Sequence, residues 1–404
     1  MSEQNERENE TGEILRKIKE TEIHLDQIRG CLVGGAIGDA LGYPVEFWDE
    51  QKIIERYGDK GISEYSLDSK SGKALISDDT QMTLFTANGI LVGDTRGQMR
   101  GIRSAPRYYV AASYQDWLQT QEISFEENKR LKADENQSAS WLSDVRELYN
   151  KRAPGNTCLN ALKVRRREKT YPLSYIKKPL NDSKGCGGIM RIAPLALAYP
   201  AKSIDILDME GAEIAAITHG HSLGYMPAVV LTHIINRVVF SENRESLKSI
   251  ILEAKQKTVE LFSKDRHLKT LTDIIELAIE LSENDDTDHN NIHHIGEGWV
   301  AEETLGIAIY CSLKYQNDFS AGVIASVNHR GDSDSTGAVT GNILGALLGF
   351  DNIDDKWKND LELLDVLKEM SDDLCHGCQM NEYGSYNDPV WTQKYIYMHH
   401  KHAL

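Results

Sequence analysis

Two ladders of glycine residues constrain the fold of this chain more than any other feature of its sequence. The glycines recur at every fourth position in two runs: Gly30, Gly34, Gly38 and Gly42, and then Gly337, Gly341, Gly345 and Gly349. Each glycine destabilises a helix by about 1 kcal/mol relative to alanine, so four at helical spacing need a compensating interaction. A helix face without side chains supplies it, because a second helix backbone can approach closely. The ladders therefore predict two central helices that pack tightly against each other.

The rest of the sequence predicts an all-α fold. Apolar residues recur with helical spacing over most of the chain, and β-branched segments do not alternate with helices. Only nine prolines interrupt the 404 residues. We expect one compact domain over residues 29–404, with a polar loop over residues 284–295. The expected helices lie near residues 78–93, 107–119, 138–150, 210–240, 244–263, 267–283, 300–315, 319–327, 335–349 and 357–375.

Residues 1–28 form an N-terminal extension to this domain. Residues 1–10 contain no apolar residue beyond Met1, which is typical of disordered segments. Ile14, Ile18, Leu25 and Ile28 then recur with roughly helical spacing and predict an amphipathic helix. We expect this helix either to pack on its own domain or to contact a partner.

Charge and cysteine content argue against several classes of partner and location. Acidic residues outnumber basic ones by 62 to 45, and the net charge of −17 would repel a nucleic-acid backbone. We therefore expect no nucleic-acid partner. No segment predicts a signal peptide or a membrane span. The six cysteines lack the spacing of a secreted domain, so we expect a cytoplasmic location.

A first acidic cluster, Ser77-Asp78-Asp79-Thr80, stands at the start of one expected helix. Serine and aspartate at a helix start cap free backbone amides, and acidic side chains there favour the helix dipole. The same side chains offer hydroxyl and carboxylate oxygens, which hard divalent cations prefer. The cluster alone does not decide between capping and metal binding.

A second acidic cluster, Asp332-Ser333-Asp334-Ser335-Thr336, also precedes an expected helix. It is not an EF-hand loop, because Ile343 stands where that loop requires glutamate. Its D-x-D-x-T pattern matches haloacid-dehalogenase-type phosphotransferases, whose fold requires a buried strand before the motif. Residues 323–327 are the candidate for that strand. Simple capping is the third interpretation of this cluster.

The two clusters taken together favour a binuclear magnesium site. Four carboxylates gathered in a partly buried site repel one another unless cations offset their charge. Two Mg²⁺ ions would supply that charge, and paired metal ions are a known device of hydrolytic enzymes.

The sequence resembles the ADP-ribosylglycohydrolase family, which includes dinitrogenase reductase-activating glycohydrolase and the ADP-ribosyl-acceptor hydrolases. The resemblance covers residues 29–350 in six blocks that follow the family's order. The blocks are Gly30–Gly42 continuing to Glu46, Ser77–Thr80, Lys184–Pro194, Thr218–His221, Gly296–Glu303 and Gly331–Ser335. The resemblance implies a compact all-α fold with a central binuclear metal cleft.

The resemblance also implies the residues of the site. Two Mg²⁺ ions, with Mn²⁺ as the alternative, would be bound by Ser77, Asp78, Asp79, Asp332, Asp334 and Ser335. ADP-ribose would be bound by Gly185, Cys186, Gly187, Gly188, Met190, Arg191, His219 and Trp299, with the diphosphate on the glycine-rich loop and the adenine near Trp299. The family often has asparagine where this chain has Cys186. Asp78, Asp79 and Glu46 are the candidate catalytic residues.

The resemblance implies a hydrolase that releases ADP-ribose from a modified protein, with arginine as the favoured acceptor. Immunity against an ADP-ribosylating toxin is one role for such an enzyme, and the N-terminal extension would then contact the toxin. A catalytically idle module that binds ADP-ribose or a toxin is an alternative function. The D-x-D-x-T phosphotransferase is the other alternative.

Overall fold

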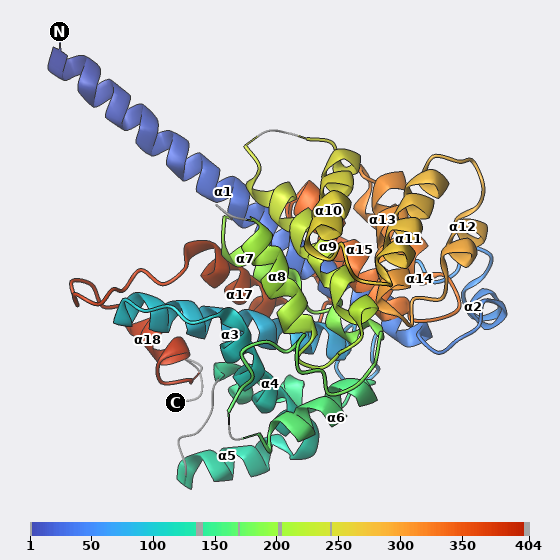
Figure 1. Cartoon of the computed structure of the whole chain (residues 1–404), viewed down its shortest axis with the longest axis horizontal. Coiled ribbons are helices and arrows are strands. Elements are labelled where there is room, and N and C mark those ends of the chain that lie inside the picture. Colours follow the sequence, from blue (N-terminus) through green and yellow to red (C-terminus); the bar gives the residue numbers. More distant parts are fainter. Residues whose placement is uncertain (1, 135–139, 169, 201–203, 243–244, 400–404) are drawn as a thin grey trace.

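The computed structural model is all-α, and the described part of the chain forms no sheet (Figure 1). It describes residues 2–134, 140–168, 170–200, 204–242 and 245–399, with the backbone alone for residues 2–20 and 132–134. The prediction of a compact all-α domain is confirmed.

The α-helices are α1 (Ser2–Gly42), α2 (Glu50–Tyr57), α3 (Asp78–Arg100), α4 (Pro106–Glu122), α5 (Phe125–Asp134), α6 (Asn156–Arg165), α7 (Ala193–Ala198), α8 (Ile204–Ala215), α9 (Ser222–Phe240), α10 (Leu247–Leu261), α11 (Leu268–Ser282), α12 (Asp288–Ile295), α13 (Ala301–Lys314), α14 (Phe319–Val327), α15 (Ser333–Leu348), α16 (Asp355–Lys358), α17 (Leu364–His376) and α18 (Pro389–Tyr395). Between them the described residues form the short 3₁₀ helices η1 (Tyr43–Val45), η2 (Trp141–Asp144), η3 (Arg146–Tyr149) and η4 (Cys186–Gly188).

The two glycine ladders face each other across the antiparallel pair α1 and α15. A Cβ added to Gly38 would lie 1.9 Å from the carbonyl oxygen of Gly337, and one added to Gly341 would lie 2.0 Å from that of Gly34. No side chain fits between the backbones, which confirms the predicted close packing. Gly349 does not belong to the ladder: it follows α15 with a φ of 84° and caps its C-terminus.

The antiparallel pairing brings the end of α1 to the start of α15. A Cβ on Gly42 would lie 2.2 Å from the carbonyl oxygen of Ser333. The start of α15 carries the second acidic cluster, and the chain that leaves α1 carries Glu46. The glycine contacts therefore determine how closely these acidic groups approach.

Other helices surround this pair and bury it. α13 and α14 pack against α15, while α9 packs against α8, α10 and α13. α9 is long and apolar enough to cross a membrane by length and composition, but 83% of its apolar 18-residue window is buried inside the protein. That burial is typical of a core helix.

Four sequence predictions about individual segments differ from the structure. Residues 357–375 were expected to form one helix, but α16 ends at Lys358 and α17 begins only at Leu364, after Leu363 adopts a left-handed φ of 60°. Residues 138–150 were expected to be helical, but residues 140–150 contain only η2 and η3. Residues 210–240 form two helices rather than one, because the chain turns at Gly220, where a Cβ would lie 2.2 Å from the carbonyl oxygen of Asn181. The expected polar loop 284–295 contains α12, whose first turn Thr287 caps by accepting a hydrogen bond from the Asn290 amide.

The N-terminal extension continues directly into α1. The helix runs from Ser2 to Gly42, and its first part projects away from the body of the molecule (Figure 1). At its inner end Ile28 is buried in the core. The side chains of Ile14 and Ile18 lie outside the described residues. The domain boundary at residue 28, the disorder of residues 1–10 and the amphipathic packing therefore stay predictions.

Candidate functional site

A cleft of about 480 Å³ opens where the starts of α3 and α15 meet the end of α1. Twelve residues predicted from the sequence line it: Glu46, Asp78, Asp79, Gly185, Cys186, Gly187, Met190, His219, Trp299, Asp332, Asp334 and Ser335. Segments far apart in the chain therefore converge on one site. The lining also contains Phe47 and residues 153–158, which sequence reasoning missed, and it does not contain Ser77, Gly188 or Arg191.

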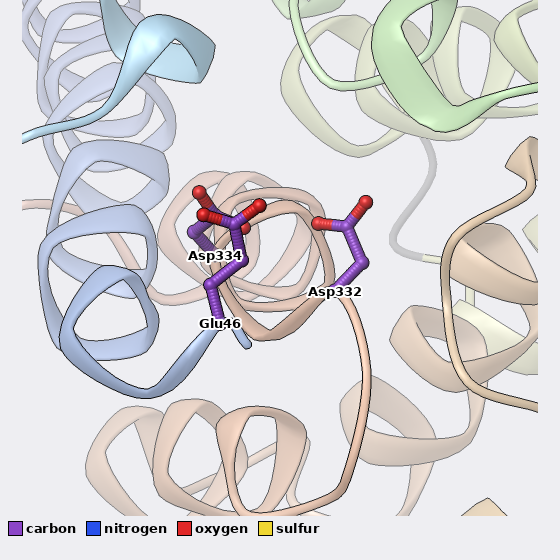
Figure 2. A group of neighbouring side chains, drawn as sticks. All are labelled: Glu46, Asp332 and Asp334. Atoms are coloured by element: carbon purple, nitrogen blue, oxygen red, sulfur yellow. The ribbon is translucent and has the colours of Figure 1, made fainter. Parts of the chain in front are cut away.

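Three carboxylates form the most compact acidic group in the cleft. One oxygen each from Glu46, Asp332 and Asp334 lies within 4.8 Å of the others, and all three residues are buried. Figure 2 shows the carboxylates of Glu46 and Asp334 close together, with the Asp332 carboxylate beside them. Sequence reasoning gave Glu46 a catalytic role only, whereas the structure also places it among the potential metal ligands.

A fully buried aspartate of α1 positions the first acidic cluster. Both carboxylate oxygens of Asp39 accept a hydrogen bond from the Ser77 amide at 3.0 Å, and one also accepts from the Thr80 amide at 3.1 Å. The Asp78 carboxylate accepts a hydrogen bond from the Gly155 amide at 3.2 Å. Asp39 therefore fixes the turn that directs Asp78 and Asp79 into the cleft. A charged residue inside the first glycine ladder was the sequence signal for it.

Hydroxyl and carboxylate groups of both clusters also cap their helices. The Asp79 amide donates to Ser77 Oγ at 3.2 Å at the start of α3. The Ser335 amide donates to Asp332 at 3.2 Å and to Asp334 at 3.0 Å at the start of α15. Capping and clustering thus occur together, because each capped helix start points its carboxylates at the same cleft.

Burial raises the pKa of every carboxyl group in the cleft, and repulsion from neighbouring carboxylates raises it further for all of them except Asp332. Burial raises the pKa of Glu46 to about 10, with the charge of Asp334 as the next cause. The same two causes raise the pKa of Asp78 and Asp79, and they raise that of Asp39 to about 7. A negative charge is therefore costly here until a cation or a proton offsets it.

Two carboxylate oxygens among the residues that line the cleft have no hydrogen-bond partner among the described residues. They are Asp79 Oδ2 and Glu46 Oε2, and both atoms are buried. Buried polar atoms in proteins nearly always have a partner. A donor set made of oxygens alone suits a hard divalent cation such as Mg²⁺ or Mn²⁺. The residues present therefore fit a metal site.

The glycine-rich loop 184–191 forms one wall of the cleft. A Cβ on Gly187 would lie 2.8 Å from the ring of His219 and 2.9 Å from Cys158 Sγ, so this position requires glycine. The Cys186 thiol donates a hydrogen bond to Asp332 at 2.8 Å. The Cys186 amide donates to the Trp299 carbonyl, and the Ile189 and Met190 amides donate to the Cys186 carbonyl. These three amides are therefore occupied within the protein.

Arg191 lies behind the cleft wall rather than in the lining. Its side chain is 0% exposed, and it contacts the ring of Tyr114 with the guanidinium 4.6 Å from the ring centre. It donates hydrogen bonds to Thr218 Oγ1 at 2.6 Å and to Cys158 Sγ at 3.3 Å. Arg191 therefore reaches the cleft through these neighbours, because α7 begins two residues later and turns its side chain into the core.

Two aromatic rings lie at the mouth of the cleft beside Glu46. Phe47 and Trp299 stack with ring centroids 5.7 Å apart and planes inclined by 22°. Phe47 is 71% exposed and Trp299 is 38% exposed. One face of Trp299 is thus covered by Phe47, and the outer face of Phe47 is open to a ligand.

The phosphotransferase interpretation lacks the strand it requires. Residues 323–327 belong to the helix α14, and Asp332 caps the start of α15 by accepting the Ser335 amide. The described chain forms no sheet at whose edge such a motif could stand.

Comparisons with known proteins identify the family of this chain. The family model described as ADP-ribosylglycohydrolase matches residues 20–384. The ADP-ribosyl-[dinitrogen reductase] glycohydrolase of Rhodospirillum rubrum is 24% identical over an alignment that covers 84% of this chain and 91% of that protein. The ADP-ribosylarginine hydrolase Tri1 of Serratia proteamaculans is 24% identical over an alignment that covers 87% of this chain and 79% of that protein.

A solved structure supports the fold. It is described as an ADP-ribosylglycohydrolase-related protein complex, and it matches with a TM-score of 0.59 and 21% identity over 88% of this chain and 99% of that one. The match of the family model covers far more than half of the chain. This chain therefore belongs to the ADP-ribosylglycohydrolase family.

Proposed function

We propose that this protein hydrolyses the glycosidic bond between ADP-ribose and an arginine side chain, with two Mg²⁺ ions in the acidic cleft. Membership in the family supports hydrolysis of an ADP-ribosyl bond in general. The choice of arginine and of two magnesium ions goes beyond that and is the content of the proposal.

The observation that carries the proposal is the buried carboxylate group with two unpartnered oxygens. Glu46, Asp332 and Asp334 lie within 4.8 Å of one another at their closest oxygens, and Asp78 and Asp79 line the same cleft. So many buried acids are unfavourable unless a cation binds among them. The family is metal-dependent, which agrees with this arrangement.

Ser77, Asp78, Asp79, Asp332, Asp334 and Ser335 are the proposed metal ligands, and Glu46 is close enough to join them. Mn²⁺ would fit the same oxygen donors. A divalent cation bound there supplies Lewis acidity toward the ribose hydroxyls and the attacking water. Ser77 contributes its Oγ from behind the lining, where it now accepts the Asp79 amide.

Asp79 is the best placed candidate for the general base. Its Oδ2 is buried without a hydrogen-bond partner among the described residues, whereas an oxygen of Asp78 already accepts the Gly155 amide. A carboxylate oxygen that is free of protein donors can accept a proton from water as the oxocarbenium-like state forms. Glu46 is the second candidate, because its Oε2 is also unpartnered.

The aromatic pair at the mouth supports a planar, cationic acceptor. Phe47 lines the same cleft as the acidic group, and its ring is largely exposed. Guanidinium groups stack on aromatic rings, and the nearby carboxylates add electrostatic attraction. A serine acceptor has no group that would use this face. The relative from Serratia proteamaculans bears the name ADP-ribosylarginine hydrolase, which agrees with the same choice.

The modified protein and ADP-ribose are the partners that this function requires. A role in immunity against an ADP-ribosylating toxin is a separate prediction that depends on α1, and the side chains of residues 1–20 lie outside the described residues. A cytoplasmic location likewise stays a prediction from the cysteine content.

The test is release of free ADP-ribose from three substrates: an ADP-ribosyl-arginine peptide, an ADP-ribosyl-serine peptide and O-acetyl-ADP-ribose. We expect release from the arginine peptide in Mg²⁺ and none in chelator. Asp79→Asn should lose turnover while it still binds ADP-ribose. Binding of ADP-ribose without hydrolysis of any substrate would instead support the idle binding module.

A further inference from the structure

A buried arginine, a threonine and a histidine form a chain of hydrogen bonds behind the glycine-rich loop. Arg191 Nη2 donates to Thr218 Oγ1 at 2.6 Å, and the same oxygen lies 2.8 Å from His219 Nδ1. All three side chains are at most 2% exposed, and His219 is the member that lines the cleft. The chain therefore connects a buried positive charge to the wall of the cleft.

No carboxylate pairs with Arg191 among the described residues. Its other contacts are Cys158 Sγ, the ring of Tyr114 and Met82 Sδ at 3.5 Å. A buried charge without a counter-ion is strongly unfavourable in a folded protein. With no carboxylate beside it, the positive charge of Arg191 acts on the neighbouring Thr218 and His219.

The direction of the hydrogen bonds follows from the chemistry of the three groups. A guanidinium has only donors, so Thr218 Oγ1 accepts from Arg191. The single hydroxyl proton of Thr218 is then available for His219 Nδ1 or for the neighbouring thiol of Cys158. The imidazole nitrogen is the stronger acceptor of the two, since sulfur accepts hydrogen bonds weakly.

We propose that Arg191 and Thr218 are positioning residues that hold His219 as the neutral tautomer with its proton on Nε2, and that this N–H donates to an oxygen of bound ADP-ribose. The proposal rests on the proposed function, because it takes ADP-ribose as the ligand of the cleft. Burial and the charge of Arg191 lower the pKa of His219 to about 3, which agrees with a neutral ring.

The glycines of the loop leave His219 Nε2 accessible. A Cβ on Gly185 would lie 3.4 Å from Nε2, and one on Gly187 would lie 3.2 Å from it. A larger side chain at either position would cover this atom. Nε2 has no hydrogen-bond partner among the described residues, so the proposed donor is free for a ligand. A neutral donor can bind a ligand oxygen without forming an ion pair with the carboxylates of the cleft.

The experiment reads the tautomer of His219 directly. Long-range ¹H–¹⁵N correlation spectra of the full chain separate Nδ1-protonated from Nε2-protonated rings, and His219→Gln assigns the signal among the 13 histidines. Thr218→Val removes the hydroxyl at constant shape, and Thr218→Ser keeps it. We expect the Nε2–H tautomer in the unaltered protein and in Thr218→Ser, and its loss in Thr218→Val. Affinity for ADP-ribose by calorimetry should fall about tenfold in Thr218→Val and return in Thr218→Ser.

An Nδ1–H tautomer in the unaltered protein would overturn the proposal. Unchanged ADP-ribose affinity in a folded Thr218→Val protein would also overturn it. If that variant does not fold, the tautomer of the unaltered protein and its shift on addition of ADP-ribose decide the question. Both readouts are equilibrium measurements that need no turnover. A protein that shows the expected tautomer and affinities but hydrolyses no substrate would refute the hydrolase function alone.

Discussion

Replacement of Asp334 by asparagine should stabilise the protein when no divalent cation is present. Asp334 takes part in two of the three close carboxylate pairs, whose nearest oxygens lie within 4.8 Å. Two unit charges at 4.8 Å repel by about 3.5 kcal/mol at an effective dielectric constant near 20. Two such pairs would add about 7 kcal/mol if all groups were ionised.

Protonation limits this penalty. A carboxyl group with an ordinary pKa of 4.5, such as that of Glu46, needs about 4 kcal/mol to keep its proton near pH 7.5, since one pKa unit equals 1.36 kcal/mol. Asparagine at position 334 removes most of the repulsion at similar volume. We therefore expect Asp334→Asn to gain about 2–4 kcal/mol of unfolding free energy in chelator.

The assay is urea unfolding of both proteins in chelator and in excess Mg²⁺. The unaltered protein should gain stability from Mg²⁺, because a ligand that binds only the folded state stabilises it. Asp334→Asn should lose most of that gain. Asp59→Asn, which removes an exposed charge outside the cleft, is the matched control and should behave like the unaltered protein. A less stable Asp334→Asn protein in chelator, with a full response to Mg²⁺, would contradict both the repulsion at Asp334 and its role in binding Mg²⁺.

Four further predictions follow from the same contacts. In chelator, the free energy of unfolding should fall as the pH rises from about 5 to 8, because Asp39 and Glu46, with pKa values raised to about 7 and about 10, keep protons that the unfolded chain releases. Mg²⁺ should flatten this pH dependence, which urea denaturation at a series of pH values measures. Gly38→Ala should destabilise the fold by about 1–3 kcal/mol, since the new Cβ meets the Gly337 carbonyl. Gly155→Ala, whose Cβ would lie 3.9 Å from Cys158 Sγ in ordinary contact, should be near neutral in the same melt. Phe47→Ala should raise the KM for an ADP-ribosyl-arginine peptide about tenfold and leave the KM for O-acetyl-ADP-ribose unchanged. Trp299→Ala should weaken the binding of ADP-ribose by about 1–3 kcal/mol, as measured by calorimetry. If the N-terminal part of α1 contacts a toxin, deletion of residues 1–24 should reduce binding to an ADP-ribosyltransferase and leave hydrolysis intact. Unchanged binding would show that this segment does not contact the toxin.

The sequence predicted the centre of the fold because its signal is local and periodic. Glycines at every fourth position can be recognised without knowing the partner helix, and their energetic cost demands that a partner exists. The two acidic clusters were predictable for the same reason, since each is a continuous motif at a helix start. Short segments without a long periodic pattern were harder to predict. Residues 140–150 form short 3₁₀ helices rather than an α-helix, and the segment that forms α12 was expected to be a loop.

Contacts between distant segments could not be read from the sequence. The hydrogen bonds from the Ser77 and Thr80 amides to Asp39 join residues about 40 positions apart, and no local pattern specifies them. Phe47 follows α1 and Trp299 precedes α13. The two rings meet at the cleft mouth because these helices are positioned by their packing in the core, which no local sequence pattern specifies. Arg191 lies in a motif that resembles a ligand-binding loop, yet its side chain turns into the core and reaches the cleft through Thr218 and Cys158.

The location of bound metal ions decides whether the acidic cleft is a binuclear metal site. Crystals grown with Mn²⁺ and ADP-ribose would show the ions through their anomalous scattering. We expect two peaks in the cleft, within bonding distance of carboxylate oxygens of Asp78, Asp79, Asp332 and Asp334, with the ribose of the ligand beside them. An ordered ligand in the cleft with no anomalous peak among these carboxylates, or with Mn²⁺ bound only elsewhere on the protein, would contradict this expectation.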